Sequence, residues 1–162
     1  DNVAPCLLGG LTIAWLTDGG ARAVRRDVDP ALVPVAMVPP FAASTAEARG
    51  LLPATVPHAD AARNAGRAAL LVAALTGTPQ ALLDATEDRL HQNYRRPALT
   101  ESTDLVDRLR AAGHPAVVSG AGPTVLVLAR GDVEAEAAAA AAPAGWRVER
   151  PGVDATGATV LP

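Results

Sequence analysis

Residues 116–130 read Ala-Val-Val-Ser-Gly-Ala-Gly-Pro-Thr-Val-Leu-Val-Leu-Ala-Arg, and this stretch decides the fold that we expect. Its two apolar runs, at 116–119 and 124–129, predict strands, because short apolar segments bounded by glycine and proline are typical of buried strands. The loop between them, residues 120–123, connects the two strands tightly. An Ala-rich segment at 132–142 follows and predicts a helix. The end of the sequence therefore alternates strands and helix.

The remaining elements follow from similar patterns on both sides of this stretch. Strands are predicted at 11–16, 21–26, 31–38, 146–150 and 158–161. Helices are predicted at 3–10, 44–51, 57–76, 80–90 and 101–112. Glycine or proline marks most of the helix ends, and apolar residues recur at helical spacing within the longer helices. Short strands mixed with helices indicate an α+β fold, in which helices cover one face of a largely antiparallel sheet.

The sequence also assigns faces to two of these helices. The helix at 57–76 carries a stripe of small and apolar residues that predicts its buried face: Ala61, Ala65, Ala68, Val72 and Leu75. A second face of the same helix predicts an internal polar network of Asp60, Asn64 and Arg67. The helix at 132–142 lacks larger apolar residues, so we expect it on the surface.

The composition excludes several classes of chemistry. All 14 basic residues are Arg, so the sequence offers no Schiff-base lysine and no P-loop lysine. A net charge of −3 argues against a nucleic-acid partner. A single cysteine excludes an internal disulfide, and the three histidines lack metal-site spacing. No apolar run reaches the roughly 18 residues of a membrane helix, so we expect a cytoplasmic protein with no membrane partner.

The loop Gly120-Ala121-Gly122-Pro123 is the first candidate site. Glycines let a backbone approach a ligand closely, and successive N–H groups can form an anion-binding nest. The alternative is a plain tight connection between two strands. The loop is not a dinucleotide fingerprint, because no capped helix follows it. Ser119 beside it has no His-Asp partner nearby in the sequence, which leaves a serine hydrolase little support.

Thr45 and Arg49 form a second candidate site. They stand four residues apart, so both lie on one helix face, close to a helix N-terminus that favours anions. A carboxylate could accept two guanidinium hydrogen bonds from Arg49 and a hydroxyl bond from Thr45. The alternative is an exposed arginine on a helix that Ser44 caps.

Arg95 and Arg96 form a third candidate, in a segment that also contains His91 and Tyr94. Clustered arginines beside an aromatic ring can bind a carboxylate or a phosphate. The alternative is a solvated loop in which the arginines pair with acidic neighbours at 87 and 88. Asn2 offers both a donor and an acceptor to a ligand hydroxyl, but the residues alone assign it no role.

Several of these segments together resemble the C-terminal half of the homoserine kinase family, within the GHMP small-molecule kinases. The segments that carry the resemblance are DNVAPCLLGG (1–10), STAEARGLLP (44–53), PHADA (57–61) with Asn64 and Arg67, EDRLHQNYR (87–95) and SGAGPT (119–124). The last segment alone indicates only the GHMP superfamily. The arginine segments make the resemblance specific to homoserine kinases.

The resemblance implies a ferredoxin-like GHMP kinase C-terminal domain at 29–162. It also implies that residues 1–28 are a remnant of the N-terminal kinase domain, a helix and a hairpin with nothing to pack on. The implied reaction transfers the ATP γ-phosphoryl group to the hydroxyl of L-homoserine, giving O-phospho-L-homoserine in threonine biosynthesis. The implied cofactors are ATP and Mg²⁺.

The resemblance also implies roles for particular residues. Asn2 would contact the reacting hydroxyl as the catalytic residue. Arg49 and Arg95 would hold the carboxylate of the amino acid, with Thr45 assisting. The remaining implied substrate contacts belong to the glycine loop, which would close over the substrate: Ser119, Gly120 and Gly122.

The sequence departs from the family in what it lacks. The Asn-Leu-Gly-Pro-Gly-Phe-Asp motif, the Gly-Leu-Gly-Ser-Ser phosphate loop and the magnesium ligands are absent and would lie upstream of Asp1. We therefore expect no cofactor-binding or metal-binding residue here, and no productive ATP binding by these residues alone. Two alternatives remain: another GHMP kinase, or a non-catalytic ferredoxin-like module that binds an amino acid or pairs subunits. As the oligomeric state, we expect a homodimer.

Overall fold

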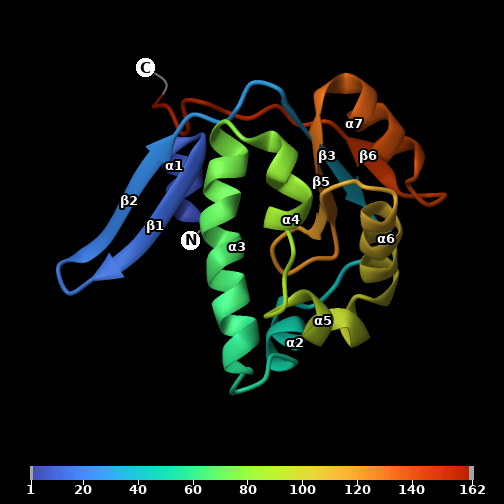
Figure 1. Ribbon diagram of the computed structural model, residues 1–162, viewed down its shortest axis with the longest axis horizontal. Helices are drawn as coiled ribbons and strands as arrows, with labels where there is room; N and C mark the ends of the chain where they lie inside the picture. The colour runs from blue at the N-terminus through green and yellow to red at the C-terminus, as the bar shows by residue number, and fades with distance from the viewer. Residues whose placement is uncertain (1, 161–162) are drawn as a thin grey trace.

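A computed structural model describes residues 2–160 of the chain, which form both helices and strands (Figure 1). The strands are β1 (Leu11–Thr17), β2 (Gly20–Arg26), β3 (Leu32–Val38), β4 (Ala116–Val118), β5 (Val125–Arg130) and β6 (Arg147–Glu149). The α-helices are α1 (Val3–Leu8), α2 (Thr45–Gly50), α3 (His58–Thr76), α4 (Leu82–Ala85), α5 (Gln92–Arg95), α6 (Thr100–Ala111) and α7 (Gly131–Ala140). Two short 3-10 helices are η1 (Pro79–Ala81) and η2 (Arg96–Ala98).

Four strands form the main sheet in the order β4-β5-β3-β6, and every neighbouring pair is antiparallel. Along the chain the elements run β3, helices, β4, β5, α7 and β6, which is the β-α-β-β-α-β pattern of a ferredoxin-like fold. The predicted α+β class is confirmed. Pro34 pairs with Leu128 of β5, while β6 reaches only residues 36–38 of β3. The proline therefore occupies a part of β3 with one neighbouring strand, where its missing N–H costs no ladder bond.

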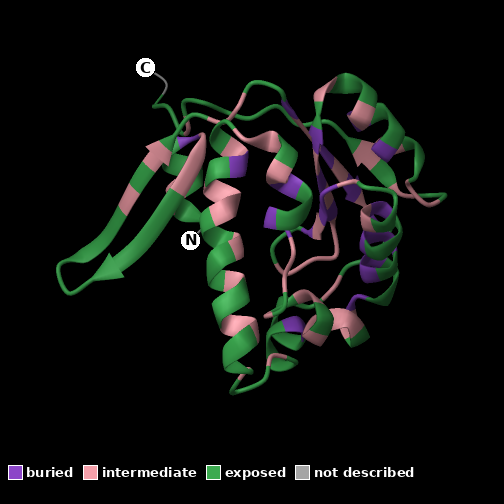
Figure 2. Ribbon diagram, viewed as in Figure 1, coloured by how far each residue is buried: buried purple, intermediate pink, exposed green. Residues whose placement is uncertain are grey.

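Helices α6 and α7 cover one face of the sheet and enclose the main core (Figure 2). Fully buried strand residues such as Val35 and Val127 meet Leu105 of α6 and Ala138 of α7 there. The surface position predicted for the helix at 132–142 was therefore wrong. Small side chains are an advantage on α7, because they let its backbone approach the sheet closely.

The expectation that helices cover only one face of the sheet was also wrong. On the opposite face, Leu32 and Leu128 pack against a second core formed by α3 and α4, which includes Ala74 and Leu82. The buried side of α3 differs from the predicted stripe, because Ala65 and Ala68 are exposed. The inward side of α3 carries Asn64 and Arg67 instead, so polar contacts decide how this helix is rotated.

The helix predicted at 80–90 is broken into η1, α4 and an irregular turn. The Thr86 hydroxyl donates to the Leu82 carbonyl oxygen at 2.7 Å, and Asp88 accepts backbone N–H bonds from the residues that follow it. These side chains offer the backbone alternatives to helical hydrogen bonds, which ends the helix early. The segment between Leu90 and Leu99, for which the sequence predicts no helix or strand, contains α5 and η2.

Strands β1 and β2 form a separate two-stranded sheet that extends away from the rest of the fold (Figure 1). The residues before β1 nevertheless pack on the end of the chain. Gly10 N–H donates to the Asp154 carbonyl oxygen at 2.6 Å, and Ala158 N–H donates to the Cys6 carbonyl oxygen at 2.8 Å. The expectation that residues 1–28 have nothing to pack on was therefore wrong. The strand predicted at 158–161 is absent from residues 158–160, so that prediction was wrong there. Leu161 lies outside the described residues.

Candidate functional site

The glycine loop between β4 and β5 is a tight turn with part of its backbone left open. Ser119 N–H donates to the Thr124 carbonyl oxygen at 2.8 Å, and Gly122 N–H donates to the Ser119 carbonyl oxygen at 2.9 Å. Gly120 has φ of 59° and Gly122 has φ of 90°, a region that glycine adopts without the steric cost of a side chain. Ser119 and Gly120 are exposed at the tip of the turn. The loop is thus a tight connection between two strands whose tip presents backbone to solvent, and its binding of a ligand stays a prediction.

Arg95 is the predicted site residue that the fold brings to this loop. Its Nη1 donates to the Gly120 carbonyl oxygen at 3.2 Å, across 25 residues of sequence. Its Nε is buried and has no hydrogen-bond partner among the described residues. Because a guanidinium carries five N–H donors, this arginine keeps donors for a further acceptor. Among the predicted site residues, Arg95 is therefore the one that the fold places at the loop with donors left for an acceptor.

Arg96, its neighbour, is committed to other contacts. Its Nη1 and Nη2 bind Asp104 at 2.8 Å and Asp107 at 2.6 Å, both on α6. The alternative predicted that these arginines pair with the acidic residues at 87 and 88. That was wrong, because Arg96 pairs with Asp104 and Asp107 instead. Arg96 anchors η2 to α6, and its acidic neighbours make it a poor anion site.

Helix α5 reaches the loop because Asp88 fixes where it begins. The Asp88 carboxylate accepts the backbone N–H groups of Leu90 at 3.0 Å, His91 at 2.9 Å and Gln92 at 2.6 Å. Asn64 of α3 donates to the same carboxylate at 3.0 Å. Burial raises the pKa of Asp88, but these donors outweigh burial and hold its pKa below the ordinary value.

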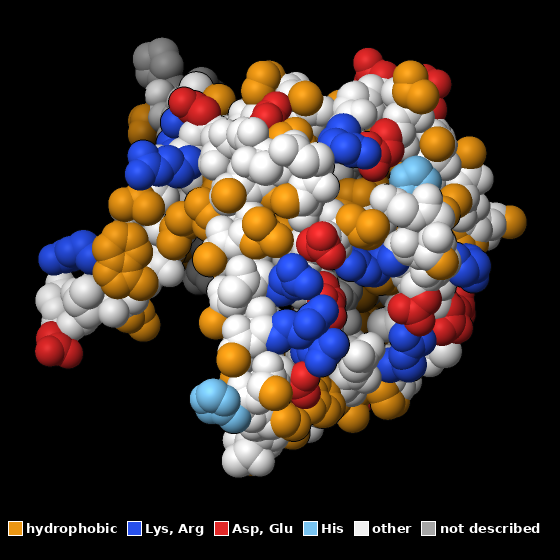
Figure 3. All heavy atoms as spheres, viewed as in Figure 1, with side chains coloured by type: hydrophobic (Ala, Val, Ile, Leu, Met, Phe, Trp, Pro, Cys, Tyr) orange, Lys and Arg blue, Asp and Glu red, His pale blue; other side chains and the backbone are white. Residues whose placement is uncertain are grey.

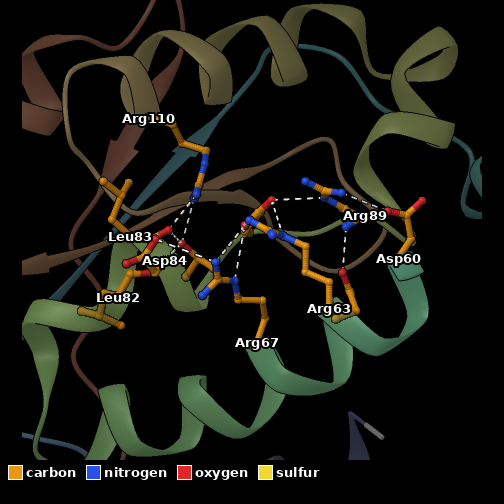
Figure 4. A network of polar contacts seen from close by, with 11 residues as sticks. Asp60, Arg63, Arg67, Leu82, Leu83, Asp84, Arg89 and Arg110 are labelled. Carbon is orange, nitrogen blue, oxygen red and sulfur yellow. Dashed lines mark hydrogen bonds and ion pairs between the residues drawn. The ribbon is translucent and has the colours of Figure 1, made fainter. Parts of the chain in front are cut away.

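A network of charged side chains joins α3 to the segment after α4 (Figure 4). Glu87 binds Arg63 at 2.7 Å, Arg67 at 3.2 Å and Arg89 at 3.2 Å, and Arg89 also binds Asp60 at 3.1 Å. The hydrogen bond from Arg63, supported by those from Arg89 and Arg67, lowers the pKa of Glu87 to about 2. Asp60, Asn64 and Arg67, predicted to form a polar network, each take part in it through partners at 87–89. Figure 3 shows arginine and acidic side chains intermingled on this face, which leaves little net charge for a ligand.

Arg110 of α6 lies at the edge of this network with backbone partners. Its Nη2 donates to the Leu83 carbonyl oxygen at 2.7 Å, and its Nη1 donates to Thr86 Oγ1 at 2.8 Å. Burial lowers the pKa of Arg110, although nearby carboxylates oppose that shift. The residue therefore ties α6 to α4 and is a structural contact.

Thr45 and Arg49 lie on α2, as the sequence predicts. Ser44 caps this helix, because its Oγ accepts the Glu47 N–H at 3.3 Å. Both candidate side chains are exposed, and the described residues offer Arg49 no ion pair. Figure 1 draws α2 and α5 at the same end of the molecule, so both arginine segments lie toward that end. Asn2 is exposed at the N-cap position of α1.

A separate hollow lies between α1 and the β1–β2 hairpin. Its volume is about 660 Å³, and its lining includes Leu7, Trp15 and Leu16. Leu16 and Val3 beside it are mostly exposed, at 84% and 69%. None of the predicted site residues lines this hollow, and apart from Arg22 its walls are apolar.

Within residues 2–160, no group of His, Cys, Asp and Glu is arranged to hold a metal ion. None of the helices described there is long and apolar enough to cross a membrane. His91 Nδ1 lies 3.2 Å from Asp88 Oδ1, so the fold engages this histidine with the start of α5.

Comparison with known proteins places these features in a family. The family described as GHMP kinases C terminal matches residues 68–148, which is half of the chain and includes α5, α6, the glycine loop and α7. The chain belongs to the GHMP kinase family. The predicted C-terminal GHMP kinase fold is therefore confirmed.

Several relatives of this GHMP kinase chain are named homoserine kinase. Homoserine kinases of Streptomyces avermitilis and Streptomyces coelicolor are 60% and 59% identical to it over 162 residues. That alignment covers all of this chain and 53% and 52% of the two relatives. The chain thus spans about half the length of the curated relatives that it matches.

Solved structures agree on the fold of the GHMP kinase chain. The crystal structure of homoserine kinase from Cytophaga hutchinsonii matches with a TM-score of 0.86 at 24% identity, covering 96% of this chain and 52% of that one. A structure from Listeria monocytogenes matches with a TM-score of 0.65 at 26% identity, covering 97% and 54%.

Sequence reasoning missed two residues that build the site. Gln92 accepts the Val118 N–H through its side-chain oxygen at 2.7 Å, and Asp88 fixes the start of α5. An Asp just before a short polar segment is a helix-start signal that could have indicated Asp88. No local pattern indicates Gln92, because its partner is 26 residues away.

Proposed function

We propose that this chain is the substrate-side half of a homoserine kinase. The full enzyme would transfer the ATP γ-phosphoryl group to the side-chain hydroxyl of L-homoserine, forming a phosphate ester and releasing ADP. The observation that carries the proposal is 60% identity to a homoserine kinase across the whole chain. Arg95, whose Nη1 contacts the glycine loop while its Nε has no partner among the described residues, supports an acceptor that bears a carboxylate.

The amino acid would be held by charge-assisted hydrogen bonds. Arg95 and Arg49 would bind its carboxylate, with the Thr45 hydroxyl as a further donor. Such bonds are stronger than neutral ones and orient a planar carboxylate. The loop from Ser119 to Gly122, of which Ser119 and Gly120 are the exposed tip, would cover the substrate once it is bound.

Asn2 would contact the reacting hydroxyl through its side-chain amide. Phosphoryl transfer depends mainly on positioning and on stabilising charge, so a neutral amide suits this role. Asn2 would orient the oxygen toward the phosphorus and would not need to remove the proton as a strong base.

ATP is the phosphoryl donor expected for a GHMP kinase, and Mg²⁺ would accompany it. The described residues supply neither a phosphate loop nor a cluster of metal-ligating side chains, so they do not fit either group. We therefore assign both groups to the part of the relatives that this chain does not match. The roles of these 162 residues concern the acceptor.

The apolar hollow at the β1–β2 hairpin supports this division. Large apolar side chains are exposed here, namely Val3, Trp15 and Leu16. Large exposed apolar patches mark interaction sites, so we infer that this surface contacts another part of the enzyme. We propose that residues 1–28 belong to the N-terminal kinase domain and pack against the rest of that domain. For the enzyme as a whole we propose a homodimer, which light scattering after size-exclusion chromatography would test.

The test is a chimeric kinase in which residues 1–162 replace the matching segment of the Streptomyces avermitilis homoserine kinase. We expect homoserine-dependent release of ADP. Arg49→Ala and Arg95→Ala should each lower kcat/KM for homoserine by about 30- to 150-fold, the equivalent of about 2–3 kcal/mol for a lost charge-assisted bond. KM for ATP should stay within twofold.

Arg147→Ala is the matched control, because that arginine is 71% exposed and binds Glu149 on its own strand. It should leave the kinetics unchanged. A chimera that folds and binds ATP but does not phosphorylate homoserine would contradict the proposed function. A change below twofold in kcat/KM for both arginine variants would reject the assignment of the carboxylate site.

A further inference from the structure

We propose that Gln92 is a positioning residue, which holds Arg95 at the glycine loop and so sets the affinity of the site for the substrate carboxylate. The inference deepens the proposed function and rests on it. Two hydrogen bonds carry it, both from α5 to the same strand–loop junction. The side-chain oxygen of Gln92 accepts the Val118 N–H at 2.7 Å, and Arg95 Nη1 donates to the Gly120 carbonyl oxygen at 3.2 Å.

Helix α5 needs such bonds, because it is only four residues long. A single helical turn is unstable by itself, so tertiary contacts must decide where α5 lies. Asp88 fixes its first residues and Asn64 ties Asp88 to α3. That arrangement anchors α5 on the side of α3. Gln92 supplies the anchor on the side of the sheet.

The partner of Gln92 is well placed for this task. Val118 is the last residue of β4, and β4 is the edge strand of the sheet. An edge strand presents N–H groups that have no neighbouring strand, and a buried N–H without a partner is costly. The amide oxygen of Gln92 satisfies this N–H two residues before the loop residue that Arg95 contacts.

The chemistry of an amide suits a position three residues from Arg95. It accepts the hydrogen bond without adding a negative charge, so it does not compete with a substrate carboxylate for the guanidinium. Small displacements of a binding group can cost large factors in rate and affinity. A shift of α5 would therefore weaken the carboxylate site while leaving the chemistry at the hydroxyl intact.

Gln92→Met in the chimeric kinase tests the proposal, because Met has similar length and cannot accept this hydrogen bond well. We expect KM for homoserine to rise about tenfold, with kcat and KM for ATP within twofold. In an Arg95→Ala background the same substitution should change KM for homoserine by less than twofold. Gln80→Met is the control, because Gln80 is exposed on η1 and should show neither effect.

A merely structural role predicts another pattern: a lower melting temperature and less active enzyme, with KM for homoserine unchanged. That result would overturn the proposal, as would a KM effect that persists in the Arg95→Ala background. A chimera inactive on homoserine would contradict the proposed function instead. Amide exchange then tests Gln92 separately. Gln92→Met should speed exchange of the Val118 amide and shift the Arg95 Nε–H resonance, and unchanged signals would overturn the positioning role whatever the acceptor is.

Discussion

Replacing Gly122 by Ala should destabilise the fold far more than the same change at Gly120, two residues earlier in the same loop. A Cβ on Gly122 would lie 2.9 Å from Leu99 Cδ1 and Cδ2 and 3.1 Å from Val118 Cγ1. Leu99 is only 1% exposed and belongs to the main core, so it has little room to move. A Cβ on Gly120 would meet nothing within 4 Å.

The magnitudes follow from these two environments. Both glycines have positive φ, which costs about 1 kcal/mol once a Cβ is present. Overpacking of a core adds about 1–3 kcal/mol at Gly122 alone. We therefore expect Gly122→Ala to lower the free energy of unfolding by about 2–4 kcal/mol and Gly120→Ala by about 1 kcal/mol.

Urea unfolding of the 162-residue chain at pH 7, followed by circular dichroism, measures these differences. Gly66→Ala is the control for the substitution itself, because Gly66 lies inside α3 with open space around it. It should stabilise the chain by about 0.5–1 kcal/mol. If Gly122→Ala and Gly120→Ala agree within about 0.5 kcal/mol, the contact with Leu99 does not constrain the loop and the reasoning fails.

Two further predictions concern the rest of the fold. Because the pKa of Glu87 is lowered to about 2 in the folded chain from 4.5, its ion pairs should contribute stability above pH 4.5 and lose it as the pH falls toward 2. Glu87→Gln should therefore cost about 1–2 kcal/mol at pH 7 by urea unfolding, and a difference that did not narrow at pH 3 would contradict this sign. Ala138→Leu should cost about 1–3 kcal/mol in the same assay, because that position is fully buried between α7 and the sheet. Ala137→Leu on the exposed side of α7 should change stability by less than about 0.5 kcal/mol, and equal losses for the two would mean that α7 does not pack as described.

Most of the secondary structure could be predicted because its signals are local. The Ser44 cap, the hairpin around residues 18–20 and the strands on either side of the glycine loop all appear where the sequence places them. The prediction of a helix at 80–90 was wrong because the Thr86 and Asp88 side chains form hydrogen bonds with the backbone there. These bonds replace the helical hydrogen bonds that the composition favours. The prediction of the buried face of α3 was wrong because hydrogen bonds to Glu87 turn Arg67 inward. Glu87 is 20 residues away from Arg67 in the sequence, so no local pattern indicates this contact.

The candidate site divides in the same way. Arg49 and Arg95 could be noticed in the sequence, because an arginine near a helix start, or in an arginine pair beside an aromatic residue, is a chemical signal in itself. Residue type and spacing alone could not separate Arg95 from Arg96, although the family resemblance implied Arg95. The fold separates them, because Asp104 and Asp107 on α6 occupy Arg96 while Arg95 keeps free donors at the loop.

The sequence by itself determined the α+β class, the absence of any lysine-based chemistry, and the arginines and glycines that could meet an anionic substrate. These properties depend on residue type and on periodicity over a few neighbours. Only the tertiary structure decided which arginine faces the loop, why Gly122 must be glycine, and how Gln92 and Asp88 anchor α5. Those outcomes depend on pairs of residues that lie some 20 or more positions apart in the sequence. Only the folding of the chain brings such pairs into contact.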